Sequence, residues 1–293
     1  MKGNYLKFFT KKHYAKLAFL LGLCVSVFFF AYVLSHELRQ GKLTISFLDV
    51  GQGDSIYIES PVGNHALIDA GPGSIVLRRL GNELPFYDRR IDFVMETHPD
   101  LDHSGGMPSV LSRDDVGALM VSPGNSLNKQ EQLVERIAKT EEIPVVIAKR
   151  GQVVDLGGGA TLRILFPDRY IEGGDTNDKS IVSELIYGKT RVLMTADEPQ
   201  AVENYLASLD GDNLKADILK LGHHGSKTAT GEALLGYVKP SFAIISVGKD
   251  NKYGHPNKET LDKLAKFGVP YLRTDEQGTI TFVSDGNTIA QKK

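Results

Sequence analysis

The sequence has a single cysteine, Cys24, among its 293 residues. One thiol cannot build a disulfide framework or a cysteine-based zinc site, so any metal ion must be held by His and carboxylate side chains. The content of 41% apolar and 24% charged residues is that of a folded protein and excludes a disordered chain. A chain of this length accommodates one catalytic domain of about 250 residues behind a short N-terminal segment.

An excess of positive charge is also missing. The chain has 34 Lys and Arg against 36 Asp and Glu, and its first 40 residues hold six of the basic residues but one of the acidic ones. Residues 41–293 are left with 28 basic and 35 acidic residues, a net charge of −7 before any carboxylate binds a metal ion. This balance argues against the basic surface of a tight, non-specific DNA-binding protein.

One apolar run, residues 17–34, carries no charge and is long enough to cross a bilayer as a helix. Five lysines precede it: Lys2, Lys7, Lys11, Lys12 and Lys16. By the positive-inside rule, we expect residues 1–40 to be a cytoplasmic stub and a single-pass anchor in the cell membrane, with residues 41–293 outside the cytoplasm. The alternative is a cleaved signal peptide, although no A-x-A-like cleavage site follows the apolar run.

Residues 41–293 alternate between apolar strands and amphipathic helices. The strands are predicted at residues 43–48, 55–59, 65–69, 92–97, 162–166, 181–187, 191–195, 217–221, 242–247 and 279–283. Helices are predicted at residues 75–84, 129–139, 198–207 and 261–267. In each half one strand leads to an Asp (Asp69 or Asp197) and another leads to a His (His98 or His223). This pattern predicts an α/β fold with two β-sheets face to face and helices outside.

The densest chemistry lies in residues 97–106, Thr-His-Pro-Asp-Leu-Asp-His-Ser-Gly-Gly. Four side chains that can bind a metal fall within six positions: His98, Asp100, Asp102 and His103. They lie between a predicted buried strand and a predicted helix, which places all four on one tight loop. Imidazole and carboxylate together suit zinc, manganese or iron, and a cation offsets the cost of burying so many polar groups. The alternative is a solvated polar turn.

This H-x-D-x-D-H array followed by Ser-Gly-Gly resembles the metal signature of the metallo-β-lactamase superfamily, with Asp100 in place of the commoner His. Four further segments resemble the hydrolase domain of ComEC competence proteins: Phe47-Leu-Asp-Val-Gly-Gln-Gly-Asp-Ser55, Leu67-Ile-Asp-Ala-Gly71, Leu219-Lys-Leu-Gly-His-His-Gly-Ser226 and Val247-Gly-Lys-Asp-Asn-Lys-Tyr-Gly-His-Pro256. The resemblance runs from residue 43 to residue 284. It implies a four-layer αββα sandwich with the ligands of both halves at one end, here in a stand-alone form with a membrane anchor.

The resemblance also implies two divalent metal ions, zinc or manganese, that share one carboxylate. The expected ligands are His98, Asp100, Asp197 and an oxygen of Asn177 or Asp178 in the first site, and Asp102, His103, Asp197 and His223 in the second. The first site is rich in oxygen, which favours manganese over zinc, and we expect it to hold its ion weakly or to stay empty. From local pattern alone, Asp197 could equally be a helix N-cap, and a buried His is commonly an ordinary core residue.

Further residues are expected to support the metal ions or the substrate. The resemblance gives Asp69 a supporting role, whose alternative is a strand-end turn. His224 is expected to be a hydrogen-bond partner or proton donor beside His223, and is the second candidate for the ligand itself. Asp102 is expected to be catalytic as well as a ligand, and Asp54 is expected at the rim of the substrate pocket.

A cationic group is predicted on the loops that follow the late strands. His255 lies on one of these loops, together with Lys249 and Lys252, and Lys227 lies on another. Cations and an imidazole beside metal ions suit an anionic phosphoryl substrate, with His255 placed to protonate the leaving oxygen. The alternative is a solvated loop with unrelated lysines.

These features predict a metal-dependent hydrolase, and they favour a phosphodiesterase or nuclease that acts on DNA or an envelope phosphodiester outside the cytoplasmic membrane. The resemblance implies DNA and a competence-type membrane partner, whereas the acidic domain favours a small or tethered substrate. The alternatives are a lactone or β-lactam hydrolase, which fits the cationic loop less well, and a non-catalytic module that binds DNA or an envelope assembly. A degenerate module would lack several ligands, and this sequence keeps them.

Overall fold

The structure is a computed structural model that describes residues 11–37, 41–123, 128–169 and 174–292. The chain forms two compact units, residues 1–40 and residues 41–293. The first unit contains helix α1 (Lys11–Glu37), in which His13–Leu34 is long and apolar enough to cross a membrane. A signal sequence near the N-terminus meets the same criterion, so the retained anchor stays a prediction.

The second unit is built on two β-sheets. In the described part of the chain, the first sheet has eight strands in the order β17-β16-β1-β2-β3-β5-β7-β8. Their bounds are β1 (Leu43–Phe47), β2 (Ile56–Glu59), β3 (His65–Ile68), β5 (Phe93–Glu96), β7 (Leu119–Val121), β8 (Val145–Ile147), β16 (Ile280–Ser284) and β17 (Ile289–Gln291). A separate pair joins β4 (Arg90–Ile91) to β6 (Asp115–Val116).

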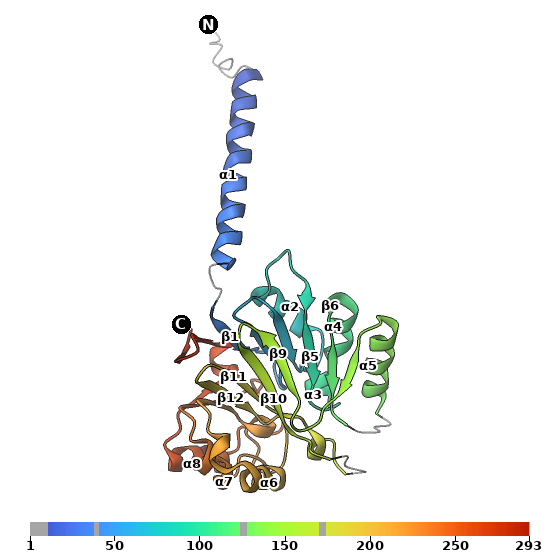
Figure 1. Ribbon diagram of the computed structural model, residues 1–293, viewed down its shortest axis with the longest axis vertical. Helices are drawn as coiled ribbons and strands as arrows, with labels where there is room; N and C mark the ends of the chain where they lie inside the picture. The colour runs from blue at the N-terminus through green and yellow to red at the C-terminus, as the bar shows by residue number, and fades with distance from the viewer. Residues whose placement is uncertain (1–10, 38–40, 124–127, 170–173, 293) are drawn as a thin grey trace. The chain divides into compact units, whose positions relative to one another are not determined.

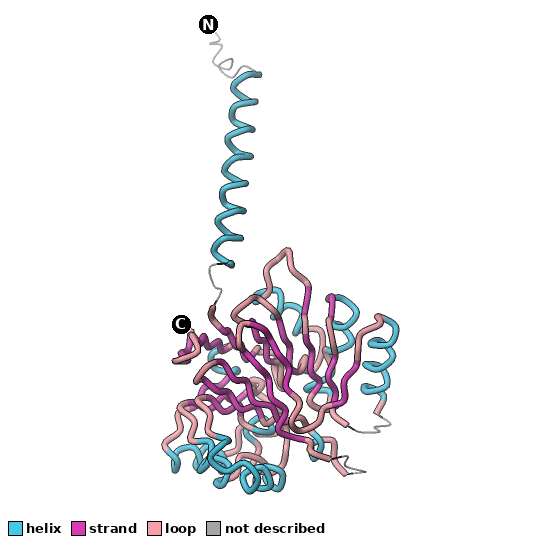
Figure 2. The backbone as a smooth tube through the Cα atoms, viewed as in Figure 1, coloured by secondary structure: helices cyan, strands magenta, loops and turns pink. Residues whose placement is uncertain are grey.

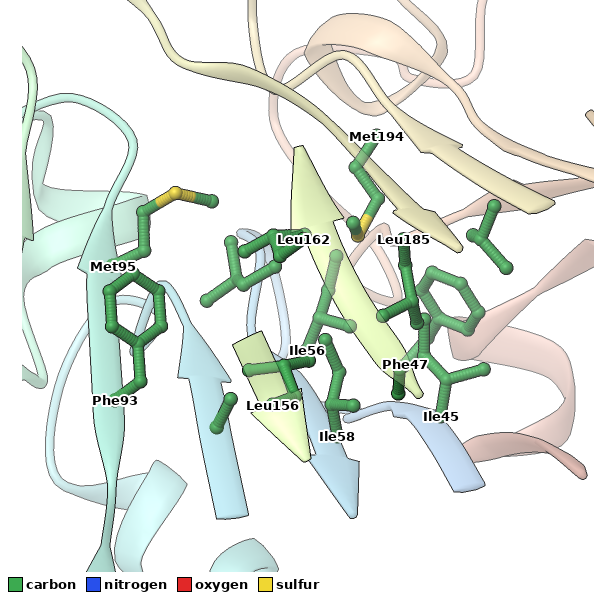
Figure 3. Packing of buried hydrophobic residues seen from close by; sticks show 14 of the residues in the cluster. Ile45, Phe47, Ile56, Ile58, Phe93, Met95, Leu156, Leu162, Leu185 and Met194 are labelled. Carbon is green, nitrogen blue, oxygen red and sulfur yellow. The ribbon is translucent and has the colours of Figure 1, made fainter. Parts of the chain in front are cut away.

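The second sheet has seven strands in the described residues, in the order β15-β14-β13-β12-β11-β10-β9. Their bounds are β9 (Val153–Gly157), β10 (Ala160–Phe166), β11 (Val182–Tyr187), β12 (Thr190–Met194), β13 (Ile218–Lys220), β14 (Phe242–Ile245) and β15 (Tyr271–Arg273). A hairpin at Gly188 and Lys189 joins β11 to β12. The apolar side chains of both sheets meet in one core (Figure 3). Phe47 of β1, Phe93 of β5 and Leu162 of β10 are examples of this shared layer.

Helices cover the outer face of each sheet (Figures 1 and 2). The helices α2 (Ile75–Glu83), α4 (Met107–Arg113) and α5 (Lys129–Thr140) share a core with the first sheet. The helices α6 (Gln200–Asp210), α7 (Glu232–Val238) and α8 (Lys258–Phe267) share a core with the second sheet. Shorter turns are α3 (Leu101–Ser104), α9 (Thr274–Gln277), η1 (Asn177–Lys179), η2 (Gly211–Leu214) and η3 (Gly222–Gly225). The predicted αββα sandwich is therefore confirmed.

The short strands were harder to predict than the long ones. Strand β8 has three exposed residues, and β17 has none that is fully buried, so neither shows the alternation that marks a half-buried strand. The helix predicted from residue 198 begins at Gln200, because Pro199 occupies the N-cap position with an extended backbone. None of these differences moves the strands that lead to the predicted ligands.

Parallel strands explain why the ligands gather. Strands β3 and β5 run parallel in the first sheet, and β12, β13 and β14 run parallel in the second. The carboxyl ends of neighbouring parallel strands lie at the same edge of a sheet, and ligand sites in α/β folds are typically built there. The loops after β5, β12 and β13 carry His98, Asp197 and His224.

Candidate metal centre

The loop after β5 delivers the first group of side chains. Helix α3 starts directly after Asp100, so Asp102 and His103 lie on its single turn. The segment before β2 packs tightly against this turn. Asp54 N donates to Asp102 O over 3.1 Å, and a Cβ on Gly53 would lie 2.1 Å from the same oxygen. Only a glycine permits this close approach, which accounts for Gly53.

The second group comes from the other sheet on a strained backbone. Asp197 follows Ala196, whose φ is 45°, and His224 has a φ of 53°. Asp69 in the first sheet, with a φ of 57°, shares this left-handed conformation. Such residues cost about 1–3 kcal/mol each and persist where their surroundings hold them. Here His223 N donates to Ala196 O over 2.9 Å and ties the two loops together.

Four side chains from both sheets converge on one point. Asp54, His103, Asp197 and His224 each place one oxygen or nitrogen within 4.8 Å of the others, and all four are buried. His103 Nε2 lies 3.2 Å from Asp197 Oδ1, and His224 Nε2 lies 3.5 Å from Asp197 Oδ2. Asp102 Oδ2 lies 3.3 Å from His224 Nε2. We call this end of the domain, which also includes His98, the metal end.

Three imidazoles present free nitrogens to this point. The Nε2 atoms of His98, His103 and His224 are buried and have no hydrogen-bond partner among the described residues. The opposite nitrogen of each ring is engaged. His103 Nδ1 lies 2.7 Å from Asp69 Oδ2, His224 Nδ1 donates to the Ser246 carbonyl over 3.0 Å, and His98 Nδ1 lies 3.1 Å from Thr97 Oγ1. This is the usual arrangement of metal-binding histidines, so the residues present fit a divalent cation.

The electrostatics of the site point the same way. Burial opposes protonation of His224, but the carboxylates of Asp197 and Asp54 raise its pKa to about 9. Burial also opposes protonation of His103, and Asp197 and Asp69 raise its pKa well above the usual value. The pKa of Asp197 is lowered by His224 and His103 in spite of its burial. The carboxylates thus favour positive charge at this point. A divalent cation would supply it, and its binding would release the protons from the histidines.

The structure places His224, and not His223, among the converging side chains. The sequence prediction favoured His223 as the ligand. Its side chain is 31% exposed, and its Nε2 lies 3.8 Å from Asp197 Oδ2. Both residues are left-handed, with φ of 48° and 53°. This turns the chain so that the second ring enters the site and the first stays at its rim. His223 lies there beside His255, with ring centroids 5.6 Å apart.

The first predicted site is less complete. Asp100 Oδ2 lies 3.9 Å from His98 Nε2, and its other oxygen accepts from Thr176 Oγ1 over 2.7 Å. Of the two candidates for the oxygen ligand, Asn177 has a buried Oδ1 with no hydrogen-bond partner in the described residues. The Asp178 carboxylate lies instead towards Gly174, where a Cβ would be 3.4 Å from its Oδ2. The geometry favours Asn177 over Asp178.

Asp54 is not at the rim of the substrate pocket, where the sequence analysis expected it. It is 2% exposed, and its Oδ2 accepts from Lys220 Nζ over 2.7 Å. Its Oδ1 lies 3.3 Å from His224 Nδ1. Lys220 is fully buried in β13 and also donates to the Leu221 carbonyl. This lysine was missed, although a Lys inside an apolar strand is a signal in itself. The pair lies beside His224, and Asp54 itself belongs to the group of side chains that converge there.

A groove of about 300 Å³ lies beside the metal end, and its lining includes Asp102, Asn251, Lys252 and Tyr253. Of the three predicted substrate-binding lysines, Lys252 therefore borders the groove. Lys227 and Lys249 are exposed on neighbouring loops.

His255 lies behind the same loop. Its ring stacks on Tyr253 with centroids 5.8 Å apart, and its buried Nδ1 has no hydrogen-bond partner in the described residues. Burial and the nearby His224 and His223 lower the pKa of His255 to about 4, so its imidazole is neutral at pH 7.

One protein family matches most of the second unit. The sequence model of the metallo-beta-lactamase superfamily matches residues 48–249. ComE operon protein 3 from Bacillus subtilis (strain 168) is 29% identical over 290 residues, which cover 93% of this chain and 37% of that relative. Competence protein ComA from Neisseria gonorrhoeae is 28% identical over 255 residues, which cover 86% of this chain and 34% of that relative. The chain thus spans about a third of the length of these curated relatives.

A solved structure is similar in fold. The metallo-beta-lactamase fold protein YhfI from Bacillus subtilis superposes with a TM-score of 0.54 at 13% identity, and the match covers 82% of this chain and 99% of that one. At this identity the likeness shows the fold alone.

Proposed function

This chain belongs to the metallo-β-lactamase superfamily of metal-dependent hydrolases, since the family match covers more than half of it, and we propose that it hydrolyses phosphodiesters. One observation carries the proposal. Three buried imidazoles with free Nε2 atoms surround Asp197 beside an open groove bordered by Lys252. Fold alone does not select a reaction, so the substrate class is inferred from this chemistry.

We propose the following metal positions. Asp102, His103, Asp197 and His224 would hold one ion, and His98 and Asp100 with Asp197 and Asn177 would hold a second, weaker one. A divalent ion bound there would polarise a phosphoryl oxygen and would lower the pKa of a water molecule towards neutrality. Carboxylate and imidazole donors suit zinc or manganese, with oxygen-rich ligands at the second position favouring manganese.

The remaining side chains bind and orient. Asp69 and the Ser246 carbonyl fix the rings of His103 and His224. Lys252, at the groove, supplies a positive charge for an anionic phosphoryl group. His255 stays our candidate for the proton of the leaving oxygen. Because its pKa is about 4, it acts at pH 7 as a neutral hydrogen-bond partner, and its protonated form contributes only in acid.

We further propose that the reaction takes place outside the cytoplasmic membrane, on DNA or on an envelope phosphodiester. The apolar helix α1 and the competence proteins among the relatives support a membrane-associated nuclease with a competence-type partner. The acidic balance of residues 41–293 supports a short or tethered strand over long duplex DNA.

The test combines metal analysis with a substrate panel. The full chain, purified in detergent, is analysed for bound metal and assayed on a chromogenic phosphate bis-ester, single-stranded DNA and a lactone. We expect one or two divalent ions and hydrolysis of the first two substrates. His255→Ala should keep its metal and fold but lose activity, and the loss should grow as the pH falls towards 4, up to the roughly 10²–10⁴ in rate of a proton donor. A metal-free protein whose stability does not change on addition of a chelator would contradict the proposal. Preferential hydrolysis of the lactone would indicate a lactone hydrolase instead.

A further inference from the structure

The end of the domain opposite the metal end carries a second, different site. Strand β12 starts at Thr190 and leads to Asp197, and β13 starts at Ile218 and leads to His224. The starts of both strands, and of β14 after Ser241, therefore lie away from the metal end. We call this the junction end, because Gly41, the first residue of the domain, lies there as shown below.

A basic groove of about 610 Å³ opens at the junction end. Five basic side chains line it: Arg163, Lys189, Arg191, Lys215 and Lys239. Two carboxylates, Asp212 and Asp217, accompany them. The domain as a whole has a net charge of −7, so this cluster of basic residues differs from the rest of the domain. A cavity of this kind attracts anions.

Part of this charge is uncompensated. Arg163 and Arg191 pair with the buried Glu184 over 2.5 and 2.8 Å, so their positive charge is partly neutralised. Lys189, Lys215 and Lys239 form no salt bridge within the described ranges, and each is exposed or borders the groove. Three mobile ammonium groups at one groove suit phosphate oxygens.

Hydrogen bonds place the N-terminal junction at the same end. Tyr187 Oη, just before the β11–β12 hairpin, donates to the Gly41 carbonyl over 2.9 Å. Ser284, which pairs with Leu43 at the start of β1, hydrogen-bonds Thr190 Oγ1 over 2.7 Å. Three residues separate Gly41 from the end of α1 at Glu37, and a fully extended chain of that length spans at most about 14 Å.

Exposed apolar side chains lie at the junction end as well. Val62, which is 54% exposed, follows Pro61, whose carbonyl accepts from Gly41 N over 2.7 Å. Phe86, which is 72% exposed, lies on the loop between α2 and β4, before the strand that leads to His98. Exposed apolar and aromatic side chains at the same end of a domain as exposed lysines are typical of surfaces that contact a membrane interface.

We propose that the basic groove binds anionic phospholipid headgroups of the membrane that α1 crosses, and so docks the domain with its metal end facing away from the bilayer. The proposal rests on α1 crossing the membrane. The lysines would lie within the short range over which an anionic surface attracts cations. A nucleic-acid strand offers the same phosphate chemistry. Because the basic groove lies at the opposite end of the domain from the metal ligands, a nucleic-acid strand is the weaker candidate for its occupant.

The chain has no tryptophan, which provides a clean probe. Ser241→Trp places a reporter at the groove, and Tyr253→Trp places one at the metal end, where the native side chain is 56% exposed. The full chain is inserted in nanodiscs of brominated phosphatidylglycerol or brominated phosphatidylcholine. We expect quenching of the groove reporter in phosphatidylglycerol alone, and none at the metal end.

Two charge variants complete the experiment. Lys189→Gln with Lys215→Gln and Lys239→Gln should abolish the quenching. A matched control removes three exposed lysines elsewhere, by Lys129→Gln, Lys139→Gln and Lys149→Gln, and should retain it. Equal quenching of both reporters, or none in phosphatidylglycerol, overturns the proposal. So does a groove reporter that responds to a DNA oligonucleotide but not to lipid, and so does failure of α1 to hold the chain in the nanodisc.

Discussion

The two ends of the domain are built from the same strands but differ in the burial of their charged side chains and in their backbone conformation. At the metal end charges are buried and the backbone is strained, as at Ala196 and His224 with their left-handed conformations. At the junction end the charges of the basic groove are open to solvent, and the hairpin there turns on Gly188, whose φ of 58° is free of steric cost. Left-handed non-glycine residues are therefore more numerous where chemistry is proposed: Asp69, Ala196, His223 and His224 lie at the metal end, and Lys239, with a φ of 47°, lies at the basic groove.

The difference teaches how much each end tolerates. Removing one partner of a buried ion pair strongly destabilises the protein, because the other charge is left unpaired in a medium of low polarity. Exposed cations act through long-range attraction and each contributes little. Substitutions of the same chemical kind should therefore have large effects at the metal end and small ones at the junction end.

The largest expected effect comes from a pair of neighbouring histidines. His224→Ala should lose the bound metal and about 10³-fold or more in activity, because a divalent ion contributes several kcal/mol of charge stabilisation. His223→Ala removes an identical ring from the rim and should keep the metal. Metal analysis and rate measurement on both proteins check this. If His223→Ala loses the metal and His224→Ala keeps it, the ligand assignment returns to the one that the sequence favoured.

Lys220→Met should give the next largest effect, on stability. It leaves Asp54 buried without its main partner, at a cost of about 3–5 kcal/mol in the free energy of unfolding. Lys189→Met makes the same change on the exposed junction end and should stay within about 0.5 kcal/mol of the native protein. Urea unfolding of the chelated proteins measures both. An effect of Lys220→Met as small as that of the control would show that the pair is dispensable.

The same pair predicts a pH dependence. Burial opposes ionisation of Asp54, but the charges of Lys220 and His224 lower its pKa below the ordinary value. A carboxyl whose pKa is lowered on folding stabilises the protein above its unfolded pKa, about 3.9, and loses this contribution as the pH falls further. In Lys220→Met the lost partner makes protonation easier. The deficit of the variant should therefore stay constant from pH 7 to about pH 4 and shrink as the pH falls further, which unfolding experiments at each pH measure.

A smaller effect is expected from Asp69→Asn. Asp69 accepts from Thr97 N and Thr97 Oγ1 and holds His103 Nδ1 at 2.7 Å, so it fixes a ligand without touching the metal position. Substitutions of such partners typically lower metal affinity or activity by about 10–100-fold. Asp92→Asn is the control, since Asp92 accepts from His65 N at the other end of the strands. Metal titration should separate the two, and equal affinities would remove Asp69 from the metal centre.

The sequence predicted what was local. Residues 97–106 carry four candidate ligands on one loop, and the structure brings His98 and His103 together with their free nitrogens facing inward. The pattern of apolar strands and amphipathic helices predicted two packed sheets with helices outside, and the resemblance to the superfamily implied the αββα sandwich. Strand β8 was missed because its three residues are exposed and carry no alternation.

Long-range geometry was beyond the sequence. Asp54 and Lys220 are 166 positions apart, so their pairing has no local signal, and Asp54 appeared to belong to a turn at the pocket rim. The choice between His223 and His224 depends on two consecutive left-handed residues. A hydrogen bond from His223 N to Ala196 O ties this turn to the loop after β12, and no local pattern of the His-His-Gly segment predicts such a contact.

The smallest expected effect compares one lysine from each end. Lys252 borders the groove beside Asp102, so Lys252→Gln should weaken binding of an anionic phosphodiester. An exposed ion pair contributes up to about 1 kcal/mol, which corresponds to an increase in KM of about five-fold. If Lys252 contributes only to substrate binding, and equally in the ground state and the transition state, KM should rise and kcat should not change. Lys215→Gln removes an equal charge from the junction end and should leave both constants unchanged. Steady-state kinetics on a bis-ester distinguish the two variants, and an equal rise in KM for both would mean that net charge, and not the position of Lys252, attracts the substrate.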